Sequence, residues 1–320
     1  MMRAVTARAG KCVVGAHKLP LPRSSECIVN IHATAVNRAD TLQRKGLYPP
    51  PPNETEILGL EMAGKLGDRR VMSLLAGGGN AECVAVDEAL LMDIPPNLSF
   101  EQAAAIPETW LTAYQLLFLV ADAQPGERIL IHACGSGVGV AATQLAVRCG
   151  MTVYGTAGTE AKLETCRRLG AQLAVSYKDK GGFAPAVLSA SDGAGVDIIL
   201  DCVGGSHAAQ NVAVMGMDAR WVVYGLMGGP RLPADLPILA KLLQKRASIH
   251  TSTLRSRSLS YKRELTRRFA AHALPLFASG DYVPLIDATF PLDEVQAAHD
   301  HMESNANTGK IVLAVTSPRL

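Results

Sequence analysis

A short apolar strand that leads through a glycine-rich turn into a helix is the feature that most restricts how this sequence can fold. A strand is predicted over Arg128–Ala133 and a helix over Val138–Cys149, and the turn between them places glycines at 135, 137 and 139. Glycine lets the backbone turn tightly and approach a pyrophosphate, and the start of the helix offers unpaired N–H groups. The literal G-x-G-x-x-G spacing is absent. The order of strand, glycines and helix nevertheless favours a dinucleotide site over a turn that binds nothing.

Strands and helices continue to alternate after this turn. Further strands are predicted over Thr152–Thr156, Val196–Asp201 and Trp221–Tyr224, and a helix over Glu160–Leu169. This alternation is typical of a parallel sheet with helices on both faces. We therefore predict an α/β fold in which residues 113–257 form a doubly wound Rossmann domain.

The first third of the chain has a different texture. Prolines, glycines and short β-type runs such as Cys27–Ala33, Arg70–Leu75 and Glu82–Val86 predict an irregular, mostly β domain. A long helix near Tyr261–Phe277, another helix over 293–304 and a strand over 311–315 follow the Rossmann pattern. With 320 residues the chain is long enough for two hydrophobic cores.

The end of the second Rossmann strand discriminates between the two nicotinamide cofactors. An acidic residue there would bind the ribose 2′-hydroxyl of NAD, but residues 155–159 read Gly-Thr-Ala-Gly-Thr. Lys162 follows in the next helix, and Tyr177 follows the third strand. A neutral strand end with a cation nearby suits a 2′-phosphate and predicts NADPH, although the position of Lys162 alone also suits an ordinary solvated lysine.

Composition and charge exclude several classes of protein. Hydrophobic residues make up 48% and charged residues 19% of the chain, which is typical of a globular protein. The net charge of +2 gives no electrostatic case for nucleic acid, and no apolar run is long enough to span a bilayer. We therefore expect a cytoplasmic protein. The C-terminal residues 317–320 resemble a peroxisomal signal, but proline at position 318 argues against that address.

Cysteine and histidine usage indicates packing more than chemistry. The seven cysteines include no Cys-x-x-Cys pair, which predicts a reducing compartment and no thiolate zinc site. Cys134 is predicted to be a small packing residue, because a nucleophile there would collide with the pyrophosphate. His132 is predicted to lie in the core, and His299 and His301 at the surface. The stretch Arg255–Arg257 is predicted to be a solvated basic loop.

Short segments spread in order over nearly the whole chain carry a family resemblance. Besides the glycine turn they are Ala35–Asp40, Gly46–Pro50, Gly59–Glu61, Ala103–Ala113, Asp201–Ser206, Tyr224–Gly229, Leu254–Arg257 and Gly309–Val312. These residues resemble the quinone oxidoreductase branch of the zinc-independent medium-chain dehydrogenase/reductase superfamily. Within that branch they are most similar to the tumour-suppressor-inducible quinone oxidoreductases and less similar to the zeta-crystallins.

The resemblance implies two domains and their roles. A GroES-like, mostly β domain made of residues 1–112 and 258–320 is expected to bind the substrate, and residues 113–257 are expected to bind NADPH in the cleft between the domains. The family also suggests a homodimer joined through the edge of the Rossmann sheet.

The resemblance further implies the contacts of the cofactor. Asn37 and Tyr48 are expected beside the nicotinamide as the catalytic residues, and Lys162 and Tyr177 beside the adenosine phosphate. The pyrophosphate and the remainder of the cofactor are expected to contact Ser136, Gly137, Val138, Gly158, Gly204, Gly225, Leu226, Met227 and Asn307.

Sequence differences from other members of the superfamily restrict the reactions and substrates that we expect. Its alcohol dehydrogenases carry Gly-His-Glu where this chain has Gly59-Leu60-Glu61, and they use a catalytic cysteine near the position of Asn37. Leucine cannot bind zinc, so no Lewis acid is expected to polarise an alcohol. The connector from Gly64 to Val71 is also shorter than usual. The expected substrates are quinones or related conjugated carbonyls, which accept hydride readily.

Two alternatives remain open at this stage. The first is an enone or 2-enoyl thioester reductase in which Tyr48 donates a proton; for quinones, water can supply that proton, and Tyr48 then only forms a wall of the cleft. The second is an NADPH-binding regulatory or RNA-binding protein with little turnover. Measuring turnover with a panel of acceptors separates these possibilities.

Overall fold

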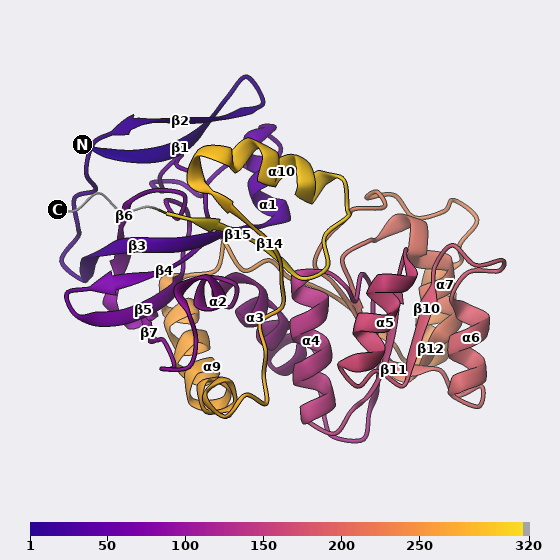
Figure 1. The fold of residues 1–320 in the computed structure, drawn as a ribbon. Helices are drawn as coiled ribbons and strands as arrows, with labels where there is room; N and C mark the ends of the chain where they lie inside the picture. The colour runs from indigo at the N-terminus through magenta and orange to yellow at the C-terminus, as the bar shows by residue number, and fades with distance from the viewer. Residues whose placement is uncertain (316–320) are drawn as a thin grey trace. The chain divides into compact units, whose positions relative to one another are not determined.

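The computed structural model describes residues 1–315 and divides into two compact units (Figure 1). One unit contains Met1–Leu111 together with the chain from Leu254 onward, and the other contains Thr112–Thr253. The C-terminal residues 317–320, for which a targeting signal was considered, lie outside the described residues.

The unit of residues 112–253 is built on a six-stranded sheet in which every pairing is parallel. The strand order is β10-β9-β8-β11-β12-β13, which is the order of a Rossmann sheet and confirms the predicted fold class. The strands are β8 (Arg128–Ile131), β9 (Thr152–Ala157), β10 (Leu173–Ser176), β11 (Val196–Asp201), β12 (Met215–Val223) and β13 (Ser248–Thr251). The helices are α4 (Gly137–Arg148), α5 (Glu160–Arg168), α6 (Ala184–Ala190), α7 (Ala208–Val214) and α8 (Ile238–Lys245), with the short 3-10 helix η3 (Gly205–His207) and a π-helical segment η2 (Gln115–Val120).

The first strand of this sheet ends earlier than predicted. We expected it to extend to Ala133, but β8 ends at Ile131. Ala133 has a φ of 50°, in the left-handed region, and this conformation ends the regular strand and starts the turn toward α4.

The other unit contains a seven-stranded, mostly antiparallel sheet with the path β14-β15-β3-β4-β5-β7, and β6 also pairs with β3. A separate hairpin joins β1 and β2. The strands are β1 (Met2–Arg8), β2 (Lys11–His17), β3 (Glu26–Val36), β4 (Glu61–Leu66), β5 (Arg69–Leu74), β6 (Cys83–Asp87), β7 (Met92–Asp93), β14 (Ile286–Pro291) and β15 (Lys310–Ala314). The helices are α1 (Arg38–Arg44), α2 (Phe100–Ala104), α3 (Pro107–Tyr114), α9 (Leu259–Ser279) and α10 (Val295–Glu303), with 3-10 helices η1 (Glu88–Leu90) and η4 (Leu292–Glu294).

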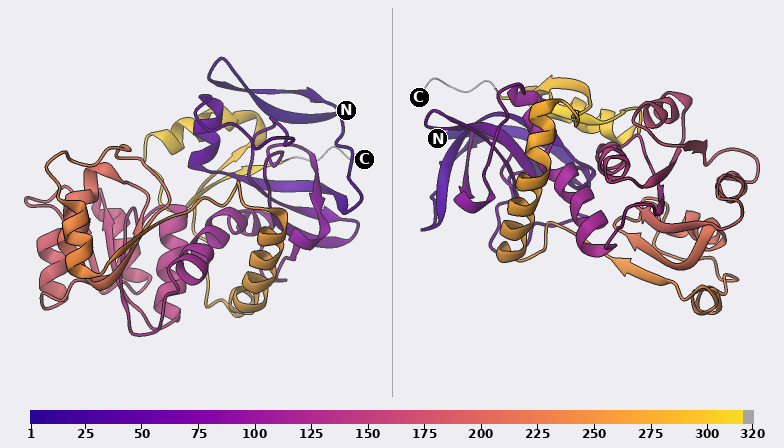
Figure 2. Two further views of the ribbon diagram at one scale, coloured as in Figure 1. Left: turned by 180° about the vertical axis from the view of Figure 1, so that it is seen from behind. Right: turned by 90° about the horizontal axis from the view of Figure 1, so that it is seen from below.

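The C-terminal strand completes the N-terminal sheet. β15 pairs antiparallel with β3, so that Ile311 lies opposite Val36 and Leu313 opposite Thr34 (Figures 1 and 2). This pairing brings Lys310 next to the end of β3, although 274 positions separate Lys310 from Val36. The shortened connector of the sequence is a tight hairpin, since β4 and β5 pair up to Leu66 and Arg69.

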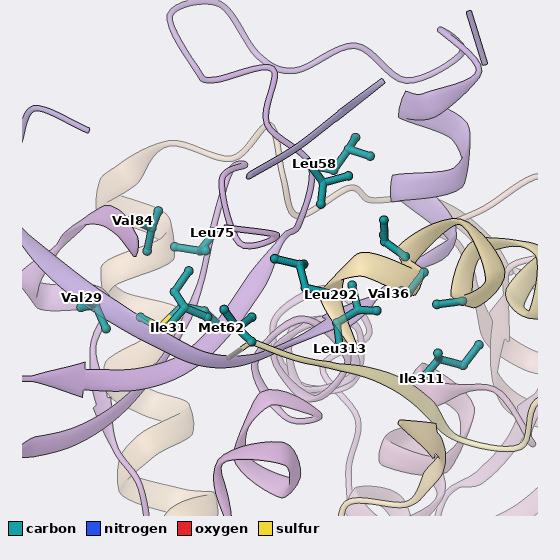
Figure 3. Close-up of a cluster of buried hydrophobic side chains, with 14 of the residues drawn as sticks. Val29, Ile31, Val36, Leu58, Met62, Leu75, Val84, Leu292, Ile311 and Leu313 are labelled. Atoms are coloured by element: carbon teal, nitrogen blue, oxygen red, sulfur yellow. The ribbon is translucent and has the colours of Figure 1, made fainter. Parts of the chain in front are cut away.

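The core of this unit follows the alternation expected of a strand with one buried face. Along β3, Val29 and Ile31 are buried and Asn30 is exposed. Both belong to one cluster of buried side chains that also contains Met62 and Leu313 from neighbouring strands, together with Leu292 (Figure 3). The last residues of β3, from Ala33 to Val36, are buried throughout, which fixes the strand end that leads to Asn37.

Two surface predictions are wrong. His299, on α10, is fully buried, and Arg255 is only 5% exposed. The helical position of His299 turns its ring into the unit, and the side chain of Arg255 is held by the carbonyl oxygen of Ala76. Neither burial is visible in the local sequence.

Candidate functional site

The glycine turn of the Rossmann unit has a geometry that excludes larger side chains. A Cβ added to Gly139 would lie 2.3 Å from the carbonyl oxygen of Ala133 and 2.6 Å from the Cα of Cys134. Only glycine therefore lets α4 begin this close to the end of β8. The Ser136 hydroxyl accepts a hydrogen bond of 3.1 Å from the Gly139 N–H and caps the helix.

The start of α4 can receive an anion. Ser136, Gly137 and Val138 are half-buried, whereas the following residues Gly139 and Val140 are buried. The N–H groups in the first turn of a helix have no carbonyl partner within the helix, and the helix dipole favours negative charge there. These features are compatible with a pyrophosphate at this turn, and the contact stays a prediction.

Lys162 and Tyr177 both lie against this part of the unit. A Cβ added to Gly135 would lie 2.8 Å from the Cβ and Cγ of Lys162, so the lysine stem crosses the glycine turn. A Cβ added to Gly158 would lie 2.4 Å from the hydroxyl of Tyr177. The two glycines thus make room for the two side chains that were predicted to face a 2′-phosphate.

The acidic side chain nearest in sequence to the end of β9 lies on helix α5 and not on the strand. Glu160 opens α5, and its carboxylate pairs with Nη1 of Arg167 at 2.5 Å. The strand itself ends at Ala157 and carries no acid at its carboxyl end. This arrangement leaves a neutral strand end beside Lys162, which is compatible with a phosphate.

The ends of β11 and β12 supply an apolar wall. Leu226 and Met227 are each 55% exposed, although both are large hydrophobic residues. Gly204 has a φ of 79°, and a Cβ there would lie 2.9 Å from Cδ2 of Leu226. A Cβ added to Gly225 would come equally close to the carbonyl oxygen of Cys202. Exposed apolar side chains at the carboxyl end of a parallel sheet are suited to contact a bound nucleotide.

Asp201 organises this end of the sheet, and sequence reasoning did not single it out. Its buried carboxylate accepts hydrogen bonds from the backbone N–H groups of Val203 and Gly204, at 2.7 and 2.9 Å. It also accepts from Nδ2 of Asn211 and from Nε1 of Trp221. The sequence signal that could have identified Asp201 is an acidic residue at the end of a predicted buried strand.

His132 and Cys134 are structural, as predicted. The ring nitrogens of His132 contact Thr156 Oγ1 at 2.9 Å and Asn211 Oδ1 at 2.7 Å, and burial lowers the pKa of His132 to about 4. The hydrogen bond with Cys166 and burial together raise the pKa of the Cys134 thiol. A neutral imidazole and an unreactive thiol follow from these surroundings.

In the other unit, Asn37 belongs to a buried polar network. The ammonium of Lys310 donates to Glu61 Oε1 and to Asn37 Oδ1, both at 2.7 Å, and to the carbonyl oxygen of Val36 at 3.2 Å. Nδ2 of Asn37 donates to the same Glu61 oxygen at 2.8 Å. The network satisfies all three protons of the buried ammonium and holds the Asn37 amide in one orientation.

Asp40 extends this network on α1. Its fully buried carboxylate accepts from the backbone N–H of Asn37 at 2.8 Å and of Gly59 at 3.1 Å. Burial raises the pKa of Asp40 to about 6 despite these bonds. Sequence reasoning missed Asp40, Glu61 and Lys310 as a group, although each lies inside a segment that carried the family resemblance.

Tyr48 is half-buried and packs against Arg255. The guanidinium carbon lies 5.4 Å from the centre of the tyrosine ring. Nε of Arg255 donates to the Ala76 carbonyl oxygen at 2.7 Å, and the Lys262 ammonium donates to the Arg255 carbonyl oxygen at 2.6 Å. These contacts hold the cation in place, so the ring has a fixed wall on one side.

Glu108 is a further acid of this unit that the sequence argument did not select. Its backbone N–H donates to Glu61 Oε2 at 2.8 Å, and its side chain is half-buried. Burial, with the charge of Glu61 as the second cause, raises the pKa of Glu108 to about 8. The available signal was an acid directly after Pro107 in an otherwise apolar segment.

The side chain of Asn307 makes a local hydrogen bond within its own segment. It is buried before β15, and its Nδ2 donates to the Gly309 carbonyl oxygen at 2.9 Å. Its assignment to the cofactor site stays a prediction.

The described part of the chain contains neither a cluster of potential metal ligands nor a helix suited to span a membrane. Within residues 1–315, no group of three or more His, Cys, Asp or Glu side chains is arranged to hold a metal ion. Leu60, which stands where the alcohol dehydrogenases carry histidine, is buried. None of the helices in the same range is both long and apolar enough to cross a membrane.

Comparisons with known proteins agree on one family. Residues 137–271 match the family model described as zinc-binding dehydrogenase. The rat synaptic vesicle membrane protein VAT-1 homolog is 30% identical over 320 residues, covering 92% of this chain and 78% of that protein. The quinone oxidoreductase of Lama guanicoe is 28% identical over 309 residues, covering 92% and 90%. The chain spans 65% of the length of the zebrafish VAT-1 homolog, to which it is 30% identical.

Solved structures give the same result. The quinone oxidoreductase of Thermus thermophilus, which was also solved in complex with NADPH, has a TM-score of 0.85 and 29% identity, covering 98% of this chain and all of that one. The CurK enoyl reductase has a TM-score of 0.84 and 25% identity, covering 98% of this chain and 99% of that one.

Proposed function

Because the chain belongs to the quinone oxidoreductase branch of the medium-chain dehydrogenase/reductase superfamily, we propose that it is an NADPH-dependent, metal-free reductase of quinones or related conjugated carbonyls. The observation that carries this proposal is the glycine turn with Lys162 and Tyr177 against it, next to a strand that carries no acid at its end. In this proposal residues 113–257 hold the cofactor, and residues 1–112 with 258–320 hold the acceptor.

Residues in the glycine turn and next to it would hold the two phosphate-bearing parts of the cofactor. Ser136, Gly137 and Val138 would contact the pyrophosphate, and Lys162 with Tyr177 would contact the 2′-phosphate. Leu226 and Met227 would lose their exposure to water against the cofactor, together with the backbone of Gly158, Gly204 and Gly225. NADPH, when bound there, supplies a hydride for the reduction.

The polar network of the other unit would help to orient the acceptor for hydride transfer. Asn37 has both amide atoms engaged by Lys310 and Glu61, so in this proposal it would present a fixed amide to the nicotinamide. Tyr48 would form a flat wall for an aromatic acceptor, because Arg255 holds its ring. A conjugated carbonyl needs no metal, since conjugation spreads the charge that develops on its oxygen.

A second candidate is a reductase of enones or 2-enoyl thioesters. It is favoured by Glu108, an acid with a pKa near neutrality in the same polar group, because reduction of an enone needs a proton as well as a hydride. The likeness to the CurK enoyl reductase supports the same class of acceptor.

We also propose a homodimer formed through the edge of the Rossmann sheet. β13 is an end strand of that sheet, and its Ile249 is 40% exposed. An uncovered edge strand with an apolar side chain is suited to pair with a second copy.

Turnover with a panel of acceptors tests the proposal. NADPH oxidation should be followed with quinones, enones and enoyl thioesters, before and after dialysis against a strong chelator. We expect conjugated carbonyls to be reduced at the same rate after dialysis. NADPH binding without oxidation by any acceptor would favour the regulatory or RNA-binding alternative, and activity restored by zinc would contradict metal-free chemistry.

A further inference from the structure

Glu108 has an unusual position among the acids of its unit. Glu61 accepts hydrogen bonds from Lys310, Asn37 and the Glu108 N–H, and Asp40 accepts from two backbone N–H groups. The carboxyl group of Glu108 has no hydrogen bond to any other residue of the range 1–315. Its backbone is therefore fixed by Glu61, while the carboxyl group of this half-buried residue keeps its own hydrogen-bonding capacity.

The charges around Glu108 come from several elements. The acids are Glu61 on β4 and Asp40 on α1, and the cations are Lys310 on β15 and Lys262 on α9. Among these acids, Glu61 raises the pKa of Glu108 the most, because a second negative charge beside the Glu61 carboxylate is unfavourable. Burial acts in the same direction and is the larger cause, so the pKa of Glu108 rises to about 8 and the acid keeps its proton at neutral pH.

Tyr48 and Arg255 complete these surroundings. The charge of Glu108 contributes to the pKa of both residues, and all three residues belong to the same unit. Burial and Glu108 raise the pKa of the Tyr48 hydroxyl above its ordinary value, so Tyr48 is a poorer proton donor than an exposed tyrosine. A proton donor is most effective when its pKa lies near the working pH, and of these two groups Glu108 meets that condition.

We propose that Glu108 is the proton donor of the reduction, and that Tyr48 serves as a wall only. This inference rests on the proposed function. With an enone, the β-carbon gains the hydride from NADPH, the C=C π bond breaks, and its electrons form an enolate. The O–H bond of Glu108 then breaks and its proton joins the enolate, so the acceptor gains two electrons, carried by the hydride, and a proton. The carboxylate left on Glu108 regains a proton from water.

Kinetics of matched variants test this step. Glu108→Gln keeps the shape of the side chain and removes the acid, and Glu101→Gln on α2 is the control at another half-buried position. We expect Glu108→Gln to lower kcat on an enone by roughly 10²–10⁴ at pH 7 and to leave quinone turnover within a few-fold. The parent should lose enone activity as the pH rises through about 8, and the variant should lose this dependence. Glu101→Gln should stay within a few-fold of the parent with both acceptors, and Tyr48→Phe should change enone and quinone turnover by the same factor.

A direct titration gives a second readout that does not depend on turnover. In protein labelled with carbon-13 at glutamate carboxyls, the resonance missing in Glu108→Gln should titrate with a midpoint of about 8. A midpoint at the ordinary value of glutamate, or enone turnover and pH dependence unchanged in Glu108→Gln, would overturn the inference. A selective loss in Tyr48→Phe would assign the proton to Tyr48 instead. If the parent itself reduces no acceptor, the proposed function fails, which is a distinct result.

Discussion

At the scale of single residues, Lys162 combines two roles that a sequence cannot separate. Its stem crosses Gly135, where any Cβ would come within 2.8 Å of it, and its position after a neutral strand end offers a charge to a 2′-phosphate. Replacing Lys162 by alanine would remove the packing and the charge together. Methionine keeps most of the stem and removes only the charge.

Lys162→Met should therefore weaken NADPH selectively. Loss of a charge-assisted phosphate contact costs about 1.5–3 kcal/mol, or about 10–150-fold in KM for NADPH, and KM for NADH should change little. Lys241→Met, at an exposed position of α8, is the control. Equal losses with both cofactors would show that Lys162 does not contact the phosphate.

At the scale of elements, features formed by neighbouring residues could be predicted from the sequence, and features that depend on the pairing of distant segments could not. The passage from β8 to α4 could be predicted, because strand, glycines and helix are neighbours in the chain. The network of Asn37, Glu61 and Lys310 could not, because it depends on the pairing of β15 with β3. Glu108, on α3, was missed for the same reason, since its pKa is set by burial and by Glu61 on strand β4.

Helix α10 illustrates the same limit through His299. The residue was predicted at the surface, but its ring is buried, and neither ring nitrogen has a hydrogen-bond partner within residues 1–315. Burial, followed by the charge of Arg44, lowers the pKa of His299 to about 4. Between about pH 4 and 6.5, the folded protein therefore binds fewer protons at His299 than the unfolded chain does. The free energy of unfolding consequently decreases as the pH falls through this window.

His299→Leu should remove this pH dependence. We expect the variant to be at least as stable as the parent at pH 7, because two unpaired buried nitrogens are lost. Its advantage should grow by up to about 1.4 kcal/mol per pH unit as the pH falls below about 6. Denaturant unfolding at several pH values measures both effects. His299→Gln should flatten the pH dependence without the gain at pH 7, and an unchanged pH dependence in both variants would contradict the assignment.

At the scale of the whole molecule, the proposed dimer depends on the edge strand β13. Light scattering coupled to size exclusion should give twice the mass of 33.8 kDa for the parent. Ile249→Lys would bury a charge at the proposed contact and should shift the protein toward the monomer. Leu21→Lys, at a 90% exposed position of the other unit, should not. A parent that is monomeric, or an unaffected Ile249→Lys dimer, would rule out assembly through this edge.

The central claim is that the protein transfers hydride from NADPH to a conjugated carbonyl. The most direct test uses NADPH deuterated at the transferred position of its nicotinamide, an enone as the acceptor, and mass spectrometry of the product. We predict one deuterium at the β-carbon of the saturated ketone, a slower single turnover than with unlabelled NADPH, and the same result in the presence of a strong chelator. A product without deuterium, or NADPH that stays bound and unoxidised beside every acceptor, would contradict the account.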